Sequence, residues 1–410
     1  MNRREFLKSA AAVVAFGVTG GLMGQSRMGS GDGANKTDGQ ITRRRYKNSD
    51  LTLPLLGFGT MRLPQKNGKI DVEAGKLLID RAMAAGLNYF DTAWPYHDGE
   101  SETFVGNALR KYPRESYILA DKLPIWSIKS VSDADRIFHE QLKKCRTDYF
   151  DFYLLHALNR SSWETVKRCN LFEFAEQMRG EGKIRKIGFS FHDTPDVLKE
   201  IAAAKPWDFA LLQINYMDWY NYHSKEQYEI VTGHGIPILV MEPLRGGALA
   251  RLNPQAIQIL KTANPEASTA SWAFRYAASL PNVLCVLSGM NLMEHLEDNI
   301  RTFTPFNPLT DSERLTLNSA LAAYRLTDSI PCTACRYCVP CPAGVMIPEI
   351  FGLYNQSKLS GDTVEFQRAV AALPEDGGPD ACVDCEACLR KCPQHINIPS
   401  ELRKVLAAAK

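Results

Sequence analysis

The sequence lacks an excess of either charge. Its 410 residues include 48 Lys and Arg and 46 Asp and Glu, which leaves a formal net charge of +2. This balance gives no electrostatic reason to expect nucleic acid or a strongly acidic partner. Hydrophobic residues make up 45% of the chain and charged residues 23%, as in a soluble globular protein. The composition excludes disorder, coiled coil and collagen for the bulk of the chain, and the length suits a barrel of ~250 residues with an appended module.

The sequence also lacks an apolar run that would span a membrane comfortably. An apolar stretch from Ala10 covers about 15 residues, against the ~18 to 20 that a spanning helix needs. Arg3 and Arg4 precede it, and residues 25–40 are rich in Gly, Ser, Asp and Asn, as in a flexible spacer. Residues 1–40 therefore resemble a twin-arginine export signal with a spacer. The resemblance implies the twin-arginine export machinery as a partner and an exported, periplasmic protein, membrane-tethered if the signal is not cleaved; a transmembrane anchor is the alternative.

A further absence concerns dinucleotide binding. The segment GFGT at 57–60 lacks the third glycine of a GxGxxG fingerprint and the helix that should follow it. Instead, short β-branched or aromatic runs alternate with longer amphipathic runs between residues 43 and about 308, which is typical of βα units around a parallel sheet. Eight such units predict an α/β protein with a closed (β/α)8 TIM barrel. An open doubly wound sheet is the structural alternative.

The predicted barrel has eight strands with helices between them. The strands are expected at Leu55–Thr60, Tyr89–Ala93, Tyr117–Lys122, Phe150–His156, Ile184–Phe191, Ala210–Tyr216, Ile236–Glu242 and Val283–Gly289. Helical periodicity predicts helices that include Val72–Ala85, Glu102–Lys111, Asp133–Cys145 and Trp163–Met178. In such barrels the chemistry lies at the carboxyl ends of the strands.

Four polar residues follow the ends of consecutive predicted strands. They are Asp91 and Tyr96 after the second strand, Lys122 at the end of the third and His156 at the end of the fourth. A Tyr hydroxyl near a Lys ammonium that is itself paired with an Asp has its pKa lowered and can act as a general acid. A neighbouring His can orient or polarise a carbonyl. The set predicts carbonyl reduction, although each residue alone also has a structural explanation as a cap, a packed aromatic, a surface charge or a core histidine.

Residues 43–308 resemble an aldo-keto reductase. The resemblance rests on LGFGTMRLP at 56–64, YFDTAWPY at 89–96, ADK at 120–122, DFYLLH at 151–156, GKIRKIGFS at 182–190, QINY at 213–216 and EPLRGG at 242–247. It implies that Asp91, Tyr96, Lys122 and His156 form a catalytic tetrad and that a bound nicotinamide cofactor carries hydride. The implied cofactor contacts are Tyr216 on the nicotinamide ring, Ser190 and Gln213 on the carboxamide, and Pro243, Leu244, Gly246 and Gly247 around the pyrophosphate.

Two departures from the family's pattern concern this cofactor. Phe191 stands where the family often has an Asn as a second carboxamide partner. In the adenosine-phosphate clamp, Gly289, Met290 and His295 replace the family's Lys, Ser and Arg, and the residues that remain are Asp298 and Asn299. A 2′-phosphate favours fixed cationic donors, for which a mostly neutral His is a poor substitute. The sequence therefore leaves the choice between NADP and NAD open.

The 11 cysteines are distributed unevenly. Cys145, Cys169 and Cys285 are isolated, whereas eight lie in the last 79 residues, in CTACRYCVPCP at 332–342 and CVDCEACLRKCP at 382–393. Each run has CxxCxxC spacing followed by a fourth cysteine and a proline, as in two-cluster ferredoxins, where the fourth cysteine ligates the other cluster. Two [4Fe-4S] clusters are therefore expected, with zinc or disulfides as alternatives. One cluster is assigned to Cys332, Cys335, Cys338 and Cys392, and the other to Cys382, Cys385, Cys388 and Cys341.

These patterns divide the chain into four segments. Residues 1–40 form the signal and spacer, 41–310 the aldo-keto reductase barrel, 311–330 a connection with a helix at Asp311–Leu326, and 331–410 the two-cluster domain. Helical runs near Ile350–Leu359 and Val364–Leu373 separate the two cysteine runs more widely than in a compact bacterial ferredoxin. The last segment is therefore similar to an α-helical ferredoxin.

The predicted function is that of an oxidoreductase that interconverts a small-molecule carbonyl and an alcohol. Aromatic residues that either line its pocket or pack the barrel are Trp94, Trp126, Trp219 and Tyr220. Because hydride transfer moves two electrons and each cluster moves one, the clusters are structural or require a redox partner protein. The alternative function is a non-catalytic redox sensor or electron-transfer subunit that uses the barrel as a docking scaffold.

Overall fold

The computed structural model describes residues 34–35 and 40–409. The predicted twin-arginine signal, with Arg3 and Arg4, lies outside the described residues. Within the described ranges, every helix is too short or too polar to cross a membrane. The described residues of the barrel and of the cysteine-rich segment belong to one compact unit.

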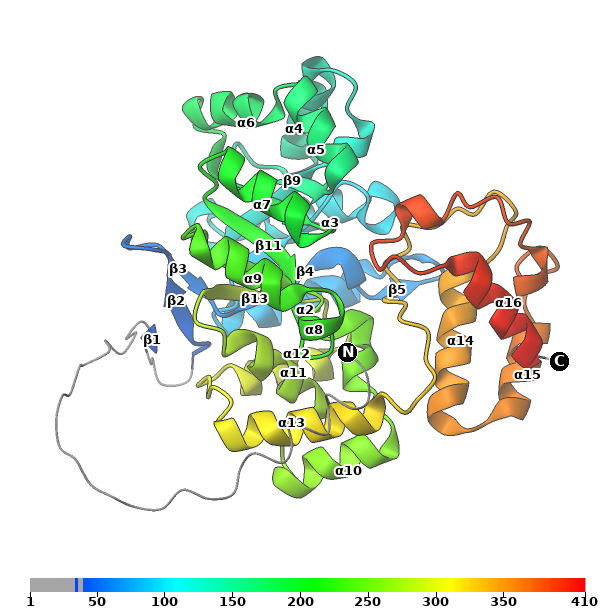
Figure 1. The fold of residues 1–410 in the computed structure, drawn as a ribbon. Helices are drawn as coiled ribbons and strands as arrows, with labels where there is room; N and C mark the ends of the chain where they lie inside the picture. The colour runs from blue at the N-terminus through cyan, green and yellow to red at the C-terminus, as the bar shows by residue number, and fades with distance from the viewer. Residues whose placement is uncertain (1–33, 36–39, 410) are drawn as a thin grey trace, which may run out of the picture. The chain divides into compact units, whose positions relative to one another are not determined.

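Eight parallel strands form a closed barrel (Figure 1). In sequence order they are β4 (Leu56–Gly59), β7 (Tyr89–Asp91), β8 (Ile118–Leu123), β9 (Phe150–Leu158), β10 (Ile184–Phe191), β11 (Phe209–Gln213), β12 (Ile238–Met241) and β13 (Val283–Ser288). Each strand pairs in parallel with the next, and β13 pairs with β4 to close the ring. The predicted α/β class and (β/α)8 barrel are confirmed. The open doubly wound alternative is wrong because the first and last strands of the barrel are hydrogen-bonded to each other.

Side chains fill the interior of the barrel. Strands β8 and β13 are buried along their whole length, as expected for parallel strands covered on both faces. Phe152 packs edge to face against Tyr89 and Phe209, with ring centroids 5.5 and 4.8 Å apart. Leu53 and Tyr46, at the antiparallel ribbon of β2 (Arg43–Arg45) and β3 (Thr52–Pro54), join the same inner cluster. The barrel is therefore a packed core, and chemistry is left to the ends of its strands.

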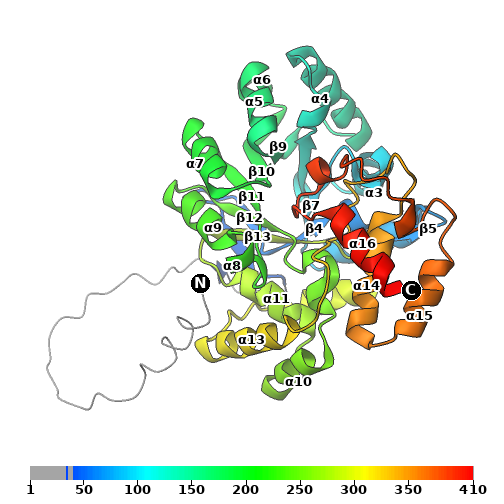
Figure 2. The same cartoon turned by 45° about the vertical axis from the view of Figure 1, so that its right-hand side comes forward.

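Helices cover the outside of the barrel (Figures 1 and 2). They are α2 (Val72–Ala84), α3 (Ser101–Leu109), α4 (Val131–Cys145), α5 (Arg160–Arg168), α6 (Leu171–Gly180), α7 (Pro195–Ala204), α8 (Asp218–Asn221), α9 (Ser224–Gly233), α10 (Pro254–Ala263), α11 (Thr269–Ala278) and α12 (Met293–Thr302). One helix differs from its prediction, because the run 163–178 is divided between α5 and α6. The chain turns at Asn170, whose φ of 49° is left-handed. Asn tolerates this conformation better than most residues other than Gly.

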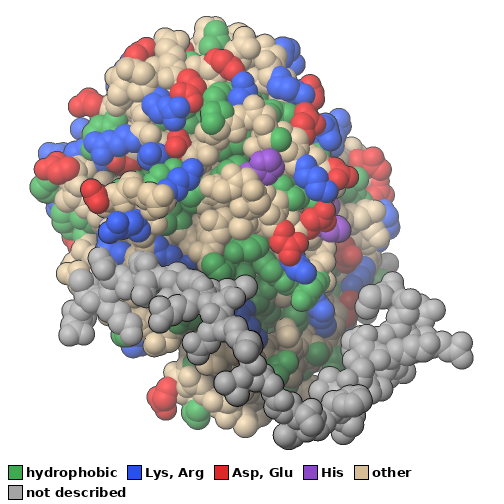
Figure 3. All heavy atoms as spheres, turned by 60° about the vertical axis from the view of Figure 1, so that its left-hand side comes forward, with side chains coloured by type: hydrophobic (Ala, Val, Ile, Leu, Met, Phe, Trp, Pro, Cys, Tyr) green, Lys and Arg blue, Asp and Glu red, His purple; other side chains and the backbone are tan. Residues whose placement is uncertain are grey.

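The surface carries both charges side by side. On the face in Figure 3, Lys and Arg side chains are interspersed with Asp and Glu. Arg81 of α2 and Glu297 of α12 form one ion pair between neighbouring helices, at 2.6 Å. This mixture agrees with the near-zero net charge of the chain.

The C-terminal segment folds around a core of its own. Its helices are α14 (Ile347–Ser360), α15 (Thr363–Ala371) and α16 (Ile398–Ala409). They surround a cluster that includes Phe351, Tyr354, Phe366, Leu402 and Val405. One cysteine run lies in the loop before α14 and the other in the loop between α15 and α16. The packing of the helices therefore brings the two cysteine loops together.

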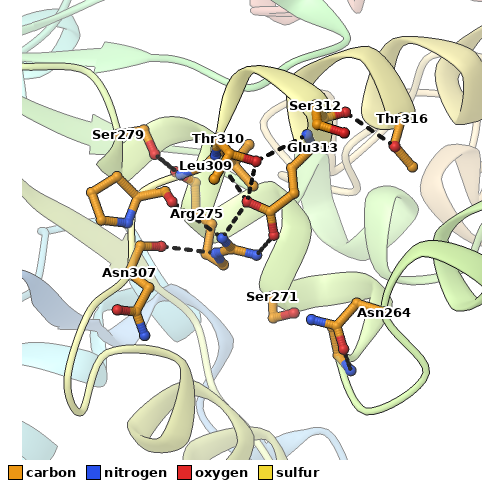
Figure 4. Close-up of polar contacts among 12 residues, drawn as sticks. Asn264, Ser271, Arg275, Ser279, Asn307, Leu309, Thr310, Ser312, Glu313 and Thr316 are labelled. Atoms are coloured by element: carbon orange, nitrogen blue, oxygen red, sulfur yellow. Dashed lines mark hydrogen bonds and ion pairs between the residues drawn. The ribbon is translucent and has the colours of Figure 1, made fainter.

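Helix α13 (Asp311–Tyr324) lies alongside α10 on the outside of the barrel (Figures 1 and 2). Figure 4 shows the polar clamp that holds its first turn. Arg275 of α11 donates hydrogen bonds to both carboxylate oxygens of Glu313, at 2.6 and 2.8 Å. Glu313 also accepts a hydrogen bond from the backbone N–H of Thr310, at 2.8 Å, in a capping box. The two charged side chains are only 13% and 22% exposed.

Replacing Glu313 by Ala should lower the free energy of unfolding by about 1 to 3 kcal/mol, because a bidentate, mostly buried ion pair and half of a capping box are lost. Anaerobic denaturant titration measures this change. The matched control is Ser312→Ala, an exposed neighbour in the same helix turn, which should change stability by less than ~0.5 kcal/mol. Equal stability of Glu313→Ala and Ser312→Ala would contradict the role of the clamp.

Candidate active site

The four predicted catalytic residues meet at the carboxyl ends of three adjacent strands. Asp91 ends β7, Lys122 lies near the end of β8, and His156 lies in β9. Tyr96 begins the short 3-10 turn that follows β7. The Nζ atom of Lys122 is 5.0 Å from the centre of the Tyr96 ring, and the rings of Tyr96 and His156 are 6.3 Å apart. The parallel register of β7, β8 and β9 therefore gathers these side chains in one cluster.

A buried ion pair holds this cluster. Lys122 is 1% exposed, and its Nζ donates hydrogen bonds to Oδ1 of Asp91 and to the carbonyl oxygen of Thr92, both at 2.6 Å. Burial raises the pKa of Asp91, and the charge of Lys122 opposes that rise. The second carboxylate oxygen of Asp91 is buried without a hydrogen-bond partner among the described residues. Because such an oxygen costs free energy, stability alone does not account for the pair.

The structure corrects the expected electrostatics of Tyr96. Burial raises the pKa of its hydroxyl well above the usual value, and the charges of Asp91 and Glu242 raise it further, against an opposing effect of Arg62. The sequence predicted a lowered pKa because of Lys122. Because burial is the largest cause of this raised pKa, Tyr96 keeps its proton through the neutral pH range.

His156 is a neutral imidazole in this site. Burial, followed by the positive charge of Lys122, lowers its pKa well below the usual value. Its Nε2 is 3.4 Å from the Oη of Tyr337, a residue of the cysteine-rich segment. The ring of Trp126 lies 5.0 Å from the His156 ring and 6.4 Å from the Tyr337 ring. The Nε2 nitrogen of His156 thus faces the cysteine-rich segment.

Trp126 is the one of the four candidate pocket aromatics that borders His156 in the described chain. The other three lie elsewhere: Trp94 against the ammonium of Lys144 at 3.8 Å, Trp219 against the ring of Tyr276 at 5.9 Å, and Tyr220 at the surface with 70% exposure.

Gln213, at the end of β11, forms a two-way amide pair with Gln394. Nε2 of Gln213 donates to Oε1 of Gln394 at 3.0 Å, and Nε2 of Gln394 donates to Oε1 of Gln213 at 2.9 Å. Gln394 is 3% exposed and lies two residues after Cys392. The Oη of Tyr222 donates a further hydrogen bond to the carbonyl oxygen of Gln394. The side chain assigned to a nicotinamide carboxamide therefore already bonds a carboxamide from the cysteine-rich segment.

The other two predicted nicotinamide contacts are also engaged. Ser190 Oγ, near the end of β10, accepts a hydrogen bond from the backbone N–H of Ala157 at 2.7 Å. Tyr216 is 3% exposed, and its ring lies in the apolar cluster that joins the barrel to α13, 6.1 Å from the ring of Tyr276. The structure thus brings Ser190 and Gln213 to strand ends but places the Tyr216 ring inside packing. Their cofactor-binding roles stay predictions.

The predicted pyrophosphate loop follows β12 and consists of Pro243, Leu244, Gly246 and Gly247. Gly246 and Gly247 have left-handed φ values of 67° and 93°. A Cβ atom on Gly246 would lie 2.2 Å from the carbonyl oxygen of Thr333, so only glycine permits this approach. Arg62 donates a hydrogen bond to the same carbonyl oxygen at 2.7 Å. The loop therefore packs directly on the backbone of the cysteine-rich segment.

The two remaining clamp residues lie on α12. Asp298 accepts a hydrogen bond from Ser268 Oγ at 2.6 Å, and Asn299 donates one to Ser288 Oγ, at the end of β13, at 3.0 Å. Both side chains are therefore bound to the barrel.

Sequence reasoning missed a buried hydrogen-bond network at the carboxyl ends of the strands, the mouth of the barrel. One carboxylate oxygen of Asp218 accepts from Nε of Arg245 at 2.9 Å. The other accepts from Gln213 at 2.8 Å and from Asn215 at 2.7 Å. Arg245 and Asn215 stand inside the motifs EPLRGG and QINY, which is the signal the sequence offered. Tyr337 and Gln394 had no comparable signal.

Two cavities in the C-terminal segment are lined by the predicted ligands. Cys332, Cys335, Cys338 and Cys392 line one, and Cys341, Cys382, Cys385 and Cys388 line the other, with Cys338 bordering both. Among the described residues, no three His, Cys, Asp or Glu side chains converge on a single ion position. The cysteines instead surround a space, and each fourth cysteine joins the other run, as cube-shaped clusters in a two-cluster ferredoxin require. The residues fit two [4Fe-4S] clusters.

In the arrangement described, the groups that the sequence assigned to a nicotinamide cofactor are engaged by other parts of the chain. Gln213 has the donor and acceptor that a carboxamide needs, but Gln394 uses both. Gly246 is closed off by Thr333, and Tyr216 is packed away. The hydrogen-bonding groups of the barrel suit the cofactor, but the cysteine-rich segment lies against Gln213 and Gly246, where the cofactor would bind.

Known proteins match this chain in two parts. Residues 55–322 match the family model of the aldo/keto reductase family, and residues 331–396 match that of the 4Fe-4S dicluster domain. YqkF of Bacillus subtilis, an uncharacterized oxidoreductase, is 26% identical over 312 residues, which cover 68% of this chain and 96% of YqkF. The NADH-specific methylglyoxal reductase of Escherichia coli is 26% identical over 303 residues, 62% of this chain and 90% of that protein. The holo form of aldo-keto reductase AKR11C1 from Bacillus halodurans superposes with a TM-score of 0.57 at 26% identity, over 68% of this chain and 96% of that one.

Anaerobically purified protein should hold about eight iron atoms, because two four-iron clusters are expected. Cys335→Ala should lose about half of the iron and weaken the second cluster, since Cys338 borders both cavities. Iron and acid-labile sulfide assays measure both effects. The matched control is Cys169→Ala, a buried cysteine outside the two cavities, which should keep all the iron. Stoichiometric zinc without iron would contradict the assignment.

Proposed function

This chain belongs to the aldo/keto reductase family, and from this premise we propose that it is an oxidoreductase that interconverts a carbonyl and an alcohol, with NADP or NAD as hydride carrier. The observation that carries the proposal is the buried Lys122–Asp91 pair beside Tyr96 and His156. The Escherichia coli relative is an NADH-specific methylglyoxal reductase, and this likeness supports a small carbonyl or alcohol as substrate and a nicotinamide as cofactor.

Each of the four residues has its own role in proton transfer or in substrate orientation. The nicotinamide, when bound, supplies the hydride that adds to the carbonyl carbon. Tyr96 donates the proton that the carbonyl oxygen takes up, since its raised pKa keeps the hydroxyl protonated at neutral pH. Lys122, whose Nζ lies 5.0 Å from the centre of the Tyr96 ring, stabilises the resulting phenolate, while Asp91 fixes the ammonium in place. Neutral His156 orients the carbonyl oxygen through Nε2.

The role we assign to the iron–sulfur module is electron transfer to a redox partner protein or structural support of the mouth. Each [4Fe-4S] cluster transfers one electron at a time, whereas the carbonyl chemistry needs two electrons as a hydride. A direct exchange between cluster and nicotinamide would therefore need a group that splits the pair. The sequence has no flavin signature for that task.

A second candidate function is a non-catalytic redox sensor or electron-transfer subunit that uses the barrel as a docking scaffold. The amide pair between Gln213 and Gln394 favours it, because a permanently filled carboxamide site would have no use for a cofactor. The intact cluster of Asp91, Lys122, Tyr96 and His156 favours catalysis instead. A scaffold has no need for a buried ion pair with an unpaired carboxylate oxygen.

We place the protein in the periplasm, exported through the twin-arginine machinery, with membrane tethering if the signal is retained. Arg3 and Arg4 before the apolar stretch support this proposal. Export in the folded state suits a protein whose clusters are inserted in the cytoplasm. Because free nicotinamide is scarce outside the cytoplasm, an exported enzyme would carry its cofactor bound and regenerate it in place.

Tyr96→Phe should lower kcat by ~10² to 10⁴, because it removes the proton donor and keeps the ring, while cofactor binding persists. In the wild type, carbonyl reduction should stay nearly constant between pH 6 and 9, since the raised pKa keeps Tyr96 protonated. Alcohol oxidation should rise with pH, because it needs the phenolate. The assay is anaerobic turnover of a carbonyl panel with NADH and NADPH supplied separately.

The matched control is Tyr220→Phe, which makes the same change at a side chain 70% exposed and should leave kcat unchanged. His156→Ala should mainly raise KM through poorer substrate orientation, and Lys122→Met should raise the Tyr96 pKa further and shift the pH profile. If the wild type turns over no carbonyl and binds neither nucleotide, the scaffold function replaces this proposal.

Replacing both Arg3 and Arg4 by Lys should retain the protein in the cytoplasm, because the arginine pair is the part of the signal that its receptor reads. Fractionation of cells followed by immunoblotting measures the distribution. The control is Arg43→Lys, beyond the signal, which should leave export unchanged. Normal export of the double Lys variant would refute the assignment.

A further inference from the structure

We propose that the iron–sulfur module is a plug for the barrel mouth, so that its docking and the binding of nicotinamide exclude each other. The inference rests on the proposed function, because it takes Gln213, Gly246 and His156 as the cofactor and substrate positions. Three residues of the module, Thr333, Tyr337 and Gln394, lie against these barrel residues. We name them the plug residues.

Gln394 fills the carboxamide position. Its side chain is a primary amide like that of nicotinamide, and it satisfies both the donor and the acceptor of Gln213, at 3.0 and 2.9 Å. Tyr222 of the barrel also holds the backbone carbonyl of Gln394. A carboxamide ligand can reach Gln213 only after Gln394 leaves. Since a buried amide left unpaired is costly, Gln213 needs one partner or the other.

Tyr337 fills the position that a substrate oxygen would take. Its Oη lies 3.4 Å from Nε2 of His156, and its ring rests beside Trp126. His156 Nε2 is the atom assigned to orient the carbonyl oxygen. A substrate oxygen and the Tyr337 hydroxyl therefore compete for one hydrogen bond.

Thr333 closes the loop assigned to the pyrophosphate. Its carbonyl oxygen lies so near Gly246 that not even a Cβ atom would fit between them, and it is held by Arg62 at 2.7 Å. Arg62 also pairs with Glu242 at 3.5 Å, in the same loop region. A diphosphate at Gly246 would have to displace Thr333. It would also have to displace the oxygens of Glu242 and Leu244, which accept hydrogen bonds from the backbone N–H groups of Gly246 and Gly247.

The plug residues all lie on the loops that ligate one cluster. Thr333 follows Cys332, Tyr337 lies between Cys335 and Cys338, and Gln394 is two residues after Cys392. These four cysteines line a single cavity, and Thr333 and Gln394 line it as well. Assembly of that cluster therefore shapes the plug. The apparent nucleotide affinity is then the intrinsic affinity multiplied by the fraction of molecules in which the module is undocked.

The test compares nucleotide binding in variants that loosen the plug from either side. Gln394→Ala removes the amide from the module, and Tyr222→Phe removes the barrel hydroxyl that holds the Gln394 carbonyl. The matched control is Gln356→Ala, the same change at an exposed site of α14 in the same module. Each full-length protein is purified anaerobically, its iron content is measured, and NADH and NADPH are titrated separately by fluorescence.

With full iron content, Gln394→Ala should bind nucleotide about 10-fold more tightly than the wild type, and Tyr222→Phe should bind more tightly to a smaller extent. Gln356→Ala should match the wild type. In the wild type, saturating nucleotide should speed hydrogen exchange of the backbone amides in 331–338 and 392–396, because these loops leave the mouth.

Three results would overturn the plug. Nucleotide binding of equal affinity in the wild type and in all variants, or binding with unchanged or slower exchange in the two loops, rejects the plug and leaves the proposed function in place. Absence of nucleotide binding in every variant, with full iron content, rejects the plug and the proposed function together. Failure of the plug alone, in which nucleotide still binds, is therefore distinguishable from failure of the proposed function, in which no nucleotide binds.

Discussion

A lysine ammonium withdrawn from water at the end of a parallel strand must be neutralised, and Lys122 meets this constraint with Asp91 on the adjacent strand. Behind the pair, Gln141 of α4 donates hydrogen bonds to the carbonyl oxygen of Lys122 and to the buried carboxylate of Glu102. These bonds fix the end of β8 against the outer helix. Burial, followed by the charge of the same ammonium, lowers the pKa of His156, while burial, followed by the charge of Asp91, raises the pKa of Tyr96 and keeps its hydroxyl protonated. The ion pair and the burial around it therefore act together on the protonation of both side chains.

The mouth above this pair is built by two parts of the chain. The barrel supplies polar groups that need partners, such as the amide of Gln213 and the Nε2 of His156. The cysteine-rich segment supplies those partners through Gln394 and Tyr337. Arg245 and Asp218, a fully buried pair, hold the amide of Gln213 at the interface. Because the side chains of Gln394 and Tyr337 bond to groups assigned to cofactor and substrate, docking of the segment and the proposed chemistry use the same atoms of the barrel.

The sequence predicted the parts that repeat a local pattern. The eight strands could be predicted because buried parallel strands are continuous apolar runs, and the cysteine quartets because their spacing is specific to clusters. The break at Asn170 could not, since the apolar periodicity continues across it. The raised pKa of Tyr96 also escaped prediction, because it depends on the burial of the side chain and on the charges of Asp91 and Glu242 in the folded protein. Gln394 and Gln213 are 181 residues apart, and the sequence around each of them gives no sign that their side chains meet.

The plug also removes the mismatch between one-electron clusters and a two-electron reaction. If docking of the module and binding of nucleotide exclude each other, the coupling between them is reciprocal. Stabilising the docked loops weakens nucleotide binding, and bound nucleotide weakens docking by the same factor. In this proposal, ligation of a cluster by Cys332, Cys335, Cys338 and Cys392 orders the loops that carry Thr333, Tyr337 and Gln394. The cluster then acts on the barrel through the position of its own ligand loops. No electron has to pass from iron to nicotinamide, and no flavin is needed between them.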